Sequence, residues 1–264
     1  MVMLRRIVKL LAISLWLPVT GFFSFFVHIG GWGAIRRVTY CSRVWGRGFI
    51  NILNVKITIT GDPDSFKGGL IVSNHMGYLD ILVHGSIFPI RFTPKIDIKH
   101  WPILGWYLGI SRPLWVDRSS KQKSIDAFQE ILDTMKHGIP ILVYPEGTST
   151  DGENGIKAFK STPFEAVAAS DFPILPVITY YEPMEDGLPV AWFGDMTLMP
   201  HLWRILGYKS INVEVHMLPP VKCEGRSRKE LAAYVHDLME KEYWNIKQRQ
   251  QERAKIQDAA LALN

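Results

Sequence analysis

A histidine and an aspartate five positions apart are the first residues in this chain whose types and spacing could support chemistry. His75 and Asp80 lie in the segment Ser-Asn-His-Met-Gly-Tyr-Leu-Asp, directly after an apolar run that predicts a β-strand. A histidine in the turn after a strand can hydrogen-bond an aspartate one turn into the following helix. Such an imidazole can take a proton from a hydroxyl group, while the aspartate fixes its tautomer. The pair predicts a general-base dyad without a nucleophile of its own.

The spacing of this pair is weak support when taken alone. Among the eight histidines of the chain, roughly 0.4 would have an aspartate five positions later by chance. The alternative is that Asn74 or His75 only caps the helix that follows. Other parts of the chain must decide between chemistry and capping.

Short apolar runs alternate with amphipathic stretches from residue 55 onward, which predicts an α/β domain. Strands are predicted at residues 55–60, 70–73, 139–144, 174–179 and 211–216, and their mostly continuous apolar character indicates cover on both faces. Helices are predicted at residues 119–137, 159–170 and 228–253. Ser119 or Ser120 opens the first of these helices and Gly138 closes it. The expected fold is a mostly buried β-sheet flanked by helices.

The first thirty-odd residues are basic and then almost wholly apolar, which predicts a membrane anchor. Residues 7–33 carry one charge, at Lys9, and are long enough to cross a bilayer, which takes ~20 apolar residues. A cleaved signal peptide is the alternative, but its apolar core is usually only ~7–15 residues long. Basic residues on both flanks favour a helical hairpin or an interfacial helix, with a bend at residues 30–33 and with Trp16 and Trp32 near the headgroups. A single span remains the other possibility.

Composition limits the classes of partner and cofactor. The formal charge of +5 favours an anionic partner such as a lipid surface, and no aromatic-basic motif or recognition helix points to nucleic acid. Cys41 and Cys223 match no zinc or disulfide spacing, and no nucleotide or metal motif is found, so no metal or cofactor is expected. The chain is expected to comprise anchoring helices at 1–50, an α/β domain at 51–240 and a polar helical tail at 241–264.

Four segments match a known family in order and spacing. They are Asn74-His75 with Asp80; residues 109–118, which end in Arg118; Pro145-Glu146-Gly147-Thr148; and the apolar, proline-containing residues 174–178. Over about residues 70–180 the chain resembles the glycerolipid acyltransferase family, which includes bacterial 1-acyl-glycerol-3-phosphate acyltransferases. The resemblance implies transfer of an acyl group from acyl-CoA or acyl-carrier protein to the hydroxyl of a lysophospholipid, without an acyl-enzyme. The principal expected acceptor is 1-acyl-sn-glycerol-3-phosphate, which gives phosphatidic acid.

The same resemblance implies cationic substrate ligands. Arg118 matches the substrate-binding arginine of the family, and a guanidinium group binds phosphate oxygens in pairs. Lys95 lies in a segment that resembles the basic stretch between the first two motifs, and it is the expected second phosphate contact. A solvated lysine is the alternative for Lys95.

The third segment forms a turn after an apolar strand, a usual place for ligand contacts in α/β folds. Glu146, beside Gly147 and Thr148, is expected either to bind a glycerol hydroxyl or to hold the loop together, and Lys160 matches a basic position after this turn in relatives. Many lysophosphatidate enzymes carry an arginine shortly after this turn, where this chain has Ser-Thr-Asp-Gly at 149–152. That departure resembles relatives with other acceptors, including lyso-ornithine lipids.

Two other functional classes compete with acyl transfer. A serine or thioester hydrolase is disfavoured because no Gly-x-Ser-x-Gly elbow occurs and because water as acceptor would not require Arg118. An inactive membrane-associated lipid-binding protein is disfavoured because both His75 and Asp80 are present. The expected location is a bacterial inner membrane, with an N-terminal anchor and the active site on the cytoplasmic face.

Overall fold

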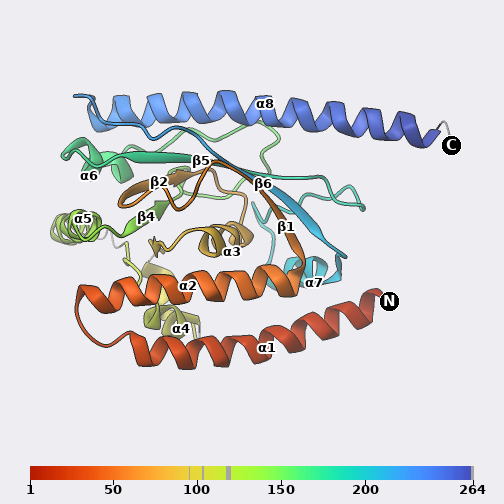
Figure 1. The fold of residues 1–264 in the computed structure, drawn as a ribbon, viewed down its shortest axis with the longest axis horizontal. Coiled ribbons are helices and arrows are strands. Elements are labelled where there is room, and N and C mark those ends of the chain that lie inside the picture. Colours follow the sequence, from red (N-terminus) through yellow and green to blue (C-terminus); the bar gives the residue numbers. More distant parts are fainter. Residues whose placement is uncertain (95, 103, 117–119, 263–264) are drawn as a thin grey trace.

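The computed structural model describes residues 1–94, 96–102, 104–116 and 120–262, which fold around a six-stranded β-sheet (Figure 1). The strands lie in the order β1-β6-β5-β2-β4-β3, with bounds β1 Val55–Thr60, β2 Gly69–Ser73, β3 Arg91–Phe92, β4 Pro140–Val143, β5 Ile174–Tyr181 and β6 Ile211–Met217. Neighbouring strands are parallel, except for the antiparallel pair β5 and β6. Strands β2, β4 and β5 are buried along their whole length, as continuous apolar runs require.

Helices cover both faces of this sheet. On one side lie α2 (Trp32–Leu53), α3 (Tyr78–Ile87) and α7 (Leu198–Gly207), and on the other lie α5 (Lys121–Lys136), α6 (Glu165–Ala168) and α8 (Arg228–Ala262) (Figure 1). Strand β2 serves both layers, because Ile71 packs with residues of α2 and α3 while Leu70 and Val72 pack with residues of α8. The predicted α/β fold, with helices on both faces, is confirmed.

The predicted helices and strands differ in how closely their first and last residues match the structure. All five predicted strands are present. Ser120 is the N-cap of α5, and its hydroxyl accepts a hydrogen bond from the Lys123 amide at 3.2 Å; Ser119 lies outside the described residues. The helix predicted at 159–170 is wrong in extent, because the structure has only a 3-10 turn η2 (Thr162–Phe164) followed by α6. Pro163 donates no backbone hydrogen bond and therefore starts a helix instead of lying inside one. Further short elements without a sequence prediction are β3, η1 (Ile96–His100), α4 (Leu104–Ile110) and α7.

The C-terminal helix does not divide at the expected boundary of residue 241. Helix α8 is continuous from Arg228 to Ala262, and two residues beyond 241, Tyr243 and Ile246, are buried in the core. The Tyr243 hydroxyl donates a hydrogen bond to the Gly152 carbonyl at 2.9 Å. The first turns of the expected solvated tail therefore belong to the folded domain.

The N-terminal residues form a helical hairpin, one of the arrangements expected from the sequence. Helix α1 (Val2–Val27) runs antiparallel to α2, which lies between α1 and the rest of the domain (Figure 1). The two helices approach closely at Gly48, where an added Cβ would lie 2.1 Å from the Trp16 ring. Trp16 is thus held inside the hairpin, where its indole N–H donates to the Trp45 carbonyl at 3.1 Å. Its expected position among lipid headgroups stays a prediction.

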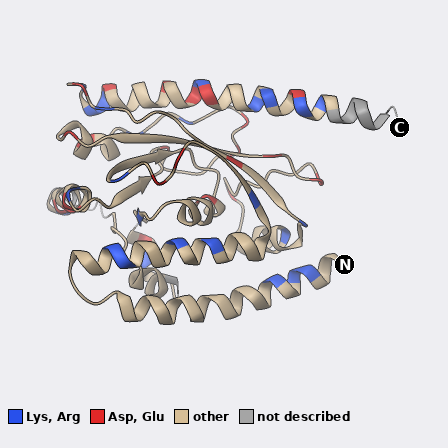
Figure 2. Cartoon of the chain, viewed as in Figure 1, with Lys and Arg blue, Asp and Glu red and all other residues tan. Residues whose placement is uncertain are grey.

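Helix α1 is long and apolar enough, by length and composition, to cross a membrane. Its few basic residues lie near its N-terminal end and the rest of the helix is uncharged (Figure 2). Lys9 is buried and donates to the carbonyls of Leu53 and Tyr208, each at 2.8 Å, and Arg5 donates to the Gly207 carbonyl at 2.7 Å. These hydrogen bonds hold the N-terminal part of α1 against the C-terminal ends of α2 and α7. Large apolar side chains such as Phe26 remain exposed on α1.

Helices α2 and α3 cross at a glycine, and this contact gives a stability prediction. A Cβ added at Gly46 would lie 2.6 Å from the Ser86 amide nitrogen and 3.0 Å from the Leu82 carbonyl oxygen. Because these neighbours are backbone atoms, Gly46→Ala is expected to lower the free energy of unfolding by about 1–3 kcal/mol. Chemical unfolding in neutral detergent measures the change. Gly109→Ala, at a helical glycine with open space around it, is the matched control and should not destabilise; equal stabilities of the two variants would contradict the prediction.

Candidate active site

The two residues of the predicted dyad are in direct contact. His75 lies in the loop after β2 and Asp80 lies in the first turn of α3, and the His75 Nδ1 is 2.8 Å from the Asp80 Oδ2. The Asp80 side chain is fully buried, while that of His75 is 20% exposed. The other ring nitrogen, Nε2, has no hydrogen-bond partner within the part of the chain that the structure describes. This nitrogen is therefore available to a substrate hydroxyl.

The Asp80 carboxylate is held by four donors. Besides the His75 ring, Oδ2 accepts hydrogen bonds from the backbone amides of Met76 at 2.6 Å and Gly77 at 3.0 Å. Oδ1 accepts from the Tyr181 hydroxyl at 2.9 Å. Asp80 therefore caps α3 and orients His75 at once, and hydrogen bonds of this kind stabilise a carboxylate. The helix is therefore capped by Asp80 at its third position and by neither Asn74 nor His75, the two residues named in the capping alternative.

A tyrosine ring covers one face of the His75 ring. The Tyr144 ring stacks on the His75 ring, with centroids 4.1 Å apart and planes 17° from parallel. The Tyr144 hydroxyl lies 2.9 Å from the Nδ1 of His84, and the Nε2 of His84 lies 2.9 Å from the Thr179 hydroxyl. The rotation of the His75 ring is thus restricted by a buried polar network from α3, β5 and the loop after β4.

Side-chain amides and carboxylates fix the loop that carries His75. The Asn74 amide makes two hydrogen bonds with the backbone of Thr179, at 2.9 and 2.8 Å, so that it extends the pairing of β2 with β5. Glu146 accepts the His75 amide at 2.7 Å with Oε1 and the Lys157 amide at 2.9 Å with Oε2. Asn74 does not cap α3, because its side-chain amide is hydrogen-bonded to the backbone of β5.

Glu146 has the loop-holding role that was one of its two expected functions. Its side chain is buried, and burial raises the pKa of its carboxyl to about 7, although the His75 and Lys157 amides act in the opposite direction. Both carboxylate oxygens already accept backbone N–H groups. Direct contact of Glu146 with a substrate stays a prediction.

The remaining residues of the turn lie at the surface beside the dyad. Gly147 has φ +72°, in the left-handed region that favours glycine, and an added Cβ there would lie 2.5 Å from the Lys160 ammonium. Lys160 therefore crosses over the turn, and both it and Thr148 are exposed. The structure brings Lys160 to the loop of Glu146. Contact of Gly147, Thr148 or Lys160 with substrate stays a prediction.

Both expected phosphate ligands, Lys95 and Arg118, lie outside the described residues. The described part of the second segment runs beside β3, since the Leu114 amide donates to the Phe92 carbonyl at 2.9 Å and the Val116 amide donates to the Pro94 carbonyl at 3.0 Å. Substrate binding by Lys95 and Arg118 stays a prediction.

Comparison with known proteins places this chain in a family. Residues 56–180 match the family model described as Acyltransferase. A lyso-ornithine lipid O-acyltransferase from Rhodobacter capsulatus is 31% identical over 193 residues, which cover 70% of this chain and 68% of that protein. The chain belongs to the acyltransferase family. A 1-acyl-sn-glycerol-3-phosphate acyltransferase from Neisseria meningitidis is 26% identical over 64% of this acyltransferase and 67% of its own length. The crystal structure of PlsC from Thermotoga maritima, a 1-acyl-sn-glycerophosphate acyltransferase, has the same fold, with a TM-score of 0.68, 18% identity and coverage of 93% and 95% of the two chains.

Sequence reasoning missed three residues of this acyltransferase site, namely Tyr144, His84 and Tyr181. His84 had a local signal, because it lies four residues after Asp80 in an otherwise apolar helix and a buried polar residue needs partners. Tyr181 had none, because it reaches Asp80 from 101 residues away.

The buried His84 of the acyltransferase gives a prediction for stability against pH. Burial lowers the pKa of His84 to about 4, although the neighbouring Asp80 acts in the opposite direction. An unfolded histidine titrates near pH 6.5, so between about pH 4 and 6.5 only the unfolded chain binds this proton. The stability that neutral His84 allows is complete above pH 6.5 and is lost as the pH falls, by about 2 kcal/mol at pH 5.

The measurement is chemical unfolding of wild type and His84→Gln at pH 7.5 and pH 5. Wild type should lose about 2 kcal/mol more than the variant between these pH values. The difference isolates His84, because Glu146, whose raised pKa gives the opposite slope, is present in both proteins. Parallel pH profiles of the two proteins would contradict the prediction.

Proposed function

We propose that this acyltransferase moves a fatty acyl group from acyl-CoA or acyl-carrier protein to the free hydroxyl of a lysolipid, with His75 as general base and Asp80 as its orienting partner. The 2.8 Å contact between the His75 Nδ1 and the Asp80 Oδ2 carries the proposal, because it leaves Nε2 unpaired among the described residues and facing outward from the buried carboxylate. That arrangement is what proton abstraction from an alcohol requires.

The reaction needs no covalent enzyme intermediate. The Nε2 of His75 takes the proton of the acceptor hydroxyl as its oxygen attacks the thioester carbonyl carbon. The tetrahedral intermediate collapses by breaking the carbon–sulfur bond, and the proton on His75 passes to the leaving thiolate. Ester and free thiol are the products, and His75 returns to its neutral form with its tautomer set by Asp80.

Two acceptors are supported by different observations. A phosphate-bearing acceptor, 1-acyl-sn-glycerol-3-phosphate, is supported by the match of Arg118 to the family's substrate-binding arginine and by the Neisseria relative. A lyso-ornithine lipid is supported by the Rhodobacter relative and by Ser-Thr-Asp-Gly at residues 149–152 in place of an arginine. The first would yield phosphatidic acid. The second carries an amino-acid headgroup and does not need a phosphate ligand.

Membrane association is part of the proposed function. Helix α1 is apolar and largely exposed, and it lies along α2 and α7 instead of projecting away from the domain. Exposed Trp106 beside α1 on α4 and Trp203 on α7 extend this surface with side chains suited to a lipid–water interface. We infer an interfacial anchor, with the dyad held close to a lysolipid in the same bilayer. The cytoplasmic face of a bacterial inner membrane is the proposed location.

The test is incubation of detergent-solubilised protein with labelled acyl-CoA, or with acyl-carrier protein as the alternative donor, and a panel of lysolipids. Mass spectrometry of the products is expected to show an acylated lysophosphatidate or lyso-ornithine lipid. Arg118→Ala should raise the KM for lysophosphatidate and leave that for a lyso-ornithine lipid unchanged. Release of free fatty acid without acceptor acylation would support a thioester hydrolase instead and would refute the proposal.

A further inference from the structure

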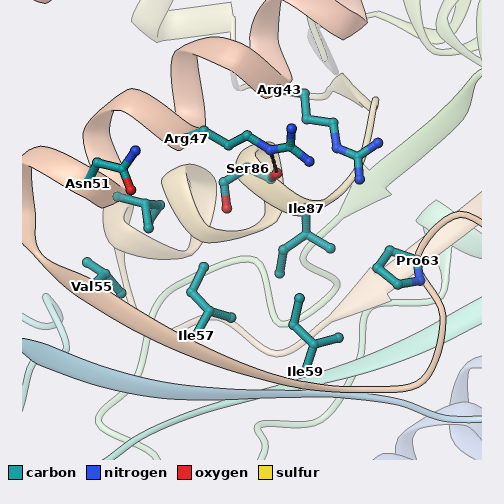
Figure 3. Close-up of a pocket in the computed structure, with 10 residues that line it drawn as sticks. Arg43, Arg47, Asn51, Val55, Ile57, Ile59, Pro63, Ser86 and Ile87 are labelled. Atoms are coloured by element: carbon teal, nitrogen blue, oxygen red, sulfur yellow. Dashed lines mark hydrogen bonds between the residues drawn. The ribbon is translucent and has the colours of Figure 1, made fainter.

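A groove of about 340 Å³ lies between α2, β1 and the C-terminal end of α3 (Figure 3). Ser86 and Ile87 from the end of α3 line it, whereas Asp80 lies in the first turn of that helix. Seven residues of helix, or about 10 Å, separate Asp80 from Ile87, and His75 is not among the lining residues. The groove is therefore a different place from the proposed catalytic site.

The floor of the groove is apolar and partly open. Val55, Ile57 and Ile59 alternate along the edge strand β1, so that all three side chains lie on the face toward α2 (Figure 3). Ile59 is 42% exposed. A volume of this size is within the range of pockets that hold small ligands. An acyl chain is the kind of group that such a floor accepts.

The rim of the groove is cationic. Arg43 and Arg47 lie one helical turn apart on α2 and extend over the isoleucines (Figure 3). Arg47 donates from Nε to the Ser86 carbonyl at 3.2 Å, and its terminal amino groups have no hydrogen-bond partner among the described residues. Arg43 pairs with Asp64 at 3.0 Å, and its Nε is buried without a partner. Two guanidinium groups against one carboxylate leave a positive charge at the mouth of an apolar groove.

The position of the groove relative to the anchor selects a lipid over a soluble anion. Residues 1–61 hold eight lysines and arginines and no aspartate or glutamate, so the hairpin has a single sign of charge (Figure 2). Helix α2 packs on α1, and packed helix axes lie about 8–10 Å apart. An interfacial α1 would be buried by about 5–10 Å, which places Arg43 and Arg47 at the level of lipid phosphates. Tyr40 and Val44, which lie on α2 within one turn of Arg43 and Arg47, are exposed.

We propose that this groove binds one anionic phospholipid of the surrounding membrane, with its phosphate on Arg47 and Arg43 and one acyl chain along Ile57 and Ile59. The arginine pair meets phosphate oxygens through charge-assisted hydrogen bonds, and the isoleucines remove part of the chain from water. This inference rests on the proposed membrane association and is independent of the proposed acyl transfer.

The experiment places the full-length protein on phosphatidylcholine vesicles that contain a trace of photoreactive lipid. The probe is phosphatidylglycerol with a diazirine near the end of one acyl chain, and phosphatidylcholine with the same chain is the neutral control. After irradiation without an acyl donor, mass spectrometry maps the labelled peptides. The peptide that contains β1 should be labelled roughly tenfold more by phosphatidylglycerol, the ratio that one charge-assisted hydrogen bond provides.

Three variants sharpen the result. Arg47→Gln should remove most of the preference for phosphatidylglycerol, and Ile59→Asp, which places a carboxylate on an already exposed position of the floor, should do the same without depending on the Ser86 contact. Lys56→Gln is the control. Like Arg47→Gln it removes one positive charge, but Lys56 precedes Ile57 and lies on the opposite face of β1, so the labelling should be unchanged.

Equal labelling by both lipids, or a preference that survives in Arg47→Gln, overturns the proposal. A diazirine acyl-CoA that labels β1 equally in wild type and in Arg47→Gln also overturns the proposal, since the groove would then hold the acyl donor. Acyl transfer, measured separately, does not bear on any of these outcomes.

Discussion

Replacing His75 by alanine is expected to slow acyl transfer by roughly 10²–10⁴-fold, the usual contribution of a positioned general base. The acceptor hydroxyl would keep its proton during attack on the thioester. Binding should persist, because the proposed substrate ligands are other residues, so the loss should fall on kcat. Single-turnover measurements with saturating acyl-CoA and lysolipid test this directly.

The fold of the His75 variant should be intact, because the side chain is 20% exposed and belongs to the loop between β2 and α3. His137→Ala, which removes an exposed histidine at the end of α5, is the matched control and should retain wild-type turnover. Activity of the His75 variant within tenfold of wild type would rule out the general-base role. Loss of cooperative unfolding would instead show that the stack on Tyr144 is structurally required.

Asp80→Asn is expected to lower kcat by roughly 10³–10⁴-fold, in line with the loss seen when the orienting aspartate of a catalytic triad becomes an amide. The amide nitrogen of asparagine is a donor, and the site offers donors from Met76, Gly77 and Tyr181. With its nitrogen in the Oδ2 position, the amide faces the N–H groups of Met76 and Gly77 and offers His75 no acceptor. With its nitrogen in the Oδ1 position, it faces the Tyr181 hydroxyl, and the neutral amide no longer stabilises the imidazolium that forms during the reaction. Turnover at saturating substrate is the measurement.

Tyr181→Phe provides a graded comparison for Asp80→Asn. It removes one of four hydrogen bonds to the carboxylate and keeps the ring that packs in the core, so a loss of roughly tenfold is expected. A Tyr181→Phe variant as slow as Asp80→Asn would show that the tyrosine itself acts in the reaction. Wild-type turnover in Asp80→Asn would remove Asp80 from the mechanism.

The dyad was predictable because it is local. A strand that ends at Ser73, a four-residue loop and a helix that starts at Tyr78 bring positions 75 and 80 together without help from distant residues. The supports of the dyad come from far along the chain: Glu146 is 71 residues from His75, and Tyr181 is 101 residues from Asp80. Such contacts depend on the order of strands β5, β2 and β4 in the sheet, which a periodicity does not reveal.

The limits of helices were predictable only where a local signal exists. Ser120 and Gly138 mark α5 because one accepts a backbone N–H and the other takes a positive φ. The sequence of the C-terminal segment predicts a solvated tail because charged neighbours outnumber Tyr243 and Ile246. They are buried because the loop at Gly152 provides a hydrogen-bond acceptor and an apolar surface for them. That surface exists only after the domain has folded.

The ties of α1 to the end of α7 also constrain how the chain assembles. Lys9 and its partner Tyr208 are separated by 199 residues, so at ordinary rates of synthesis Lys9 is made about 10–40 seconds before the carbonyl that it finally binds. On the proposed membrane association, the apolar side of α1 can partition into lipid during that interval, while its basic residues stay in the headgroup layer. The domain would then complete its folding against the bilayer. The anchor would reach its environment first, and its contacts with α7 would form only after most of the chain has been made.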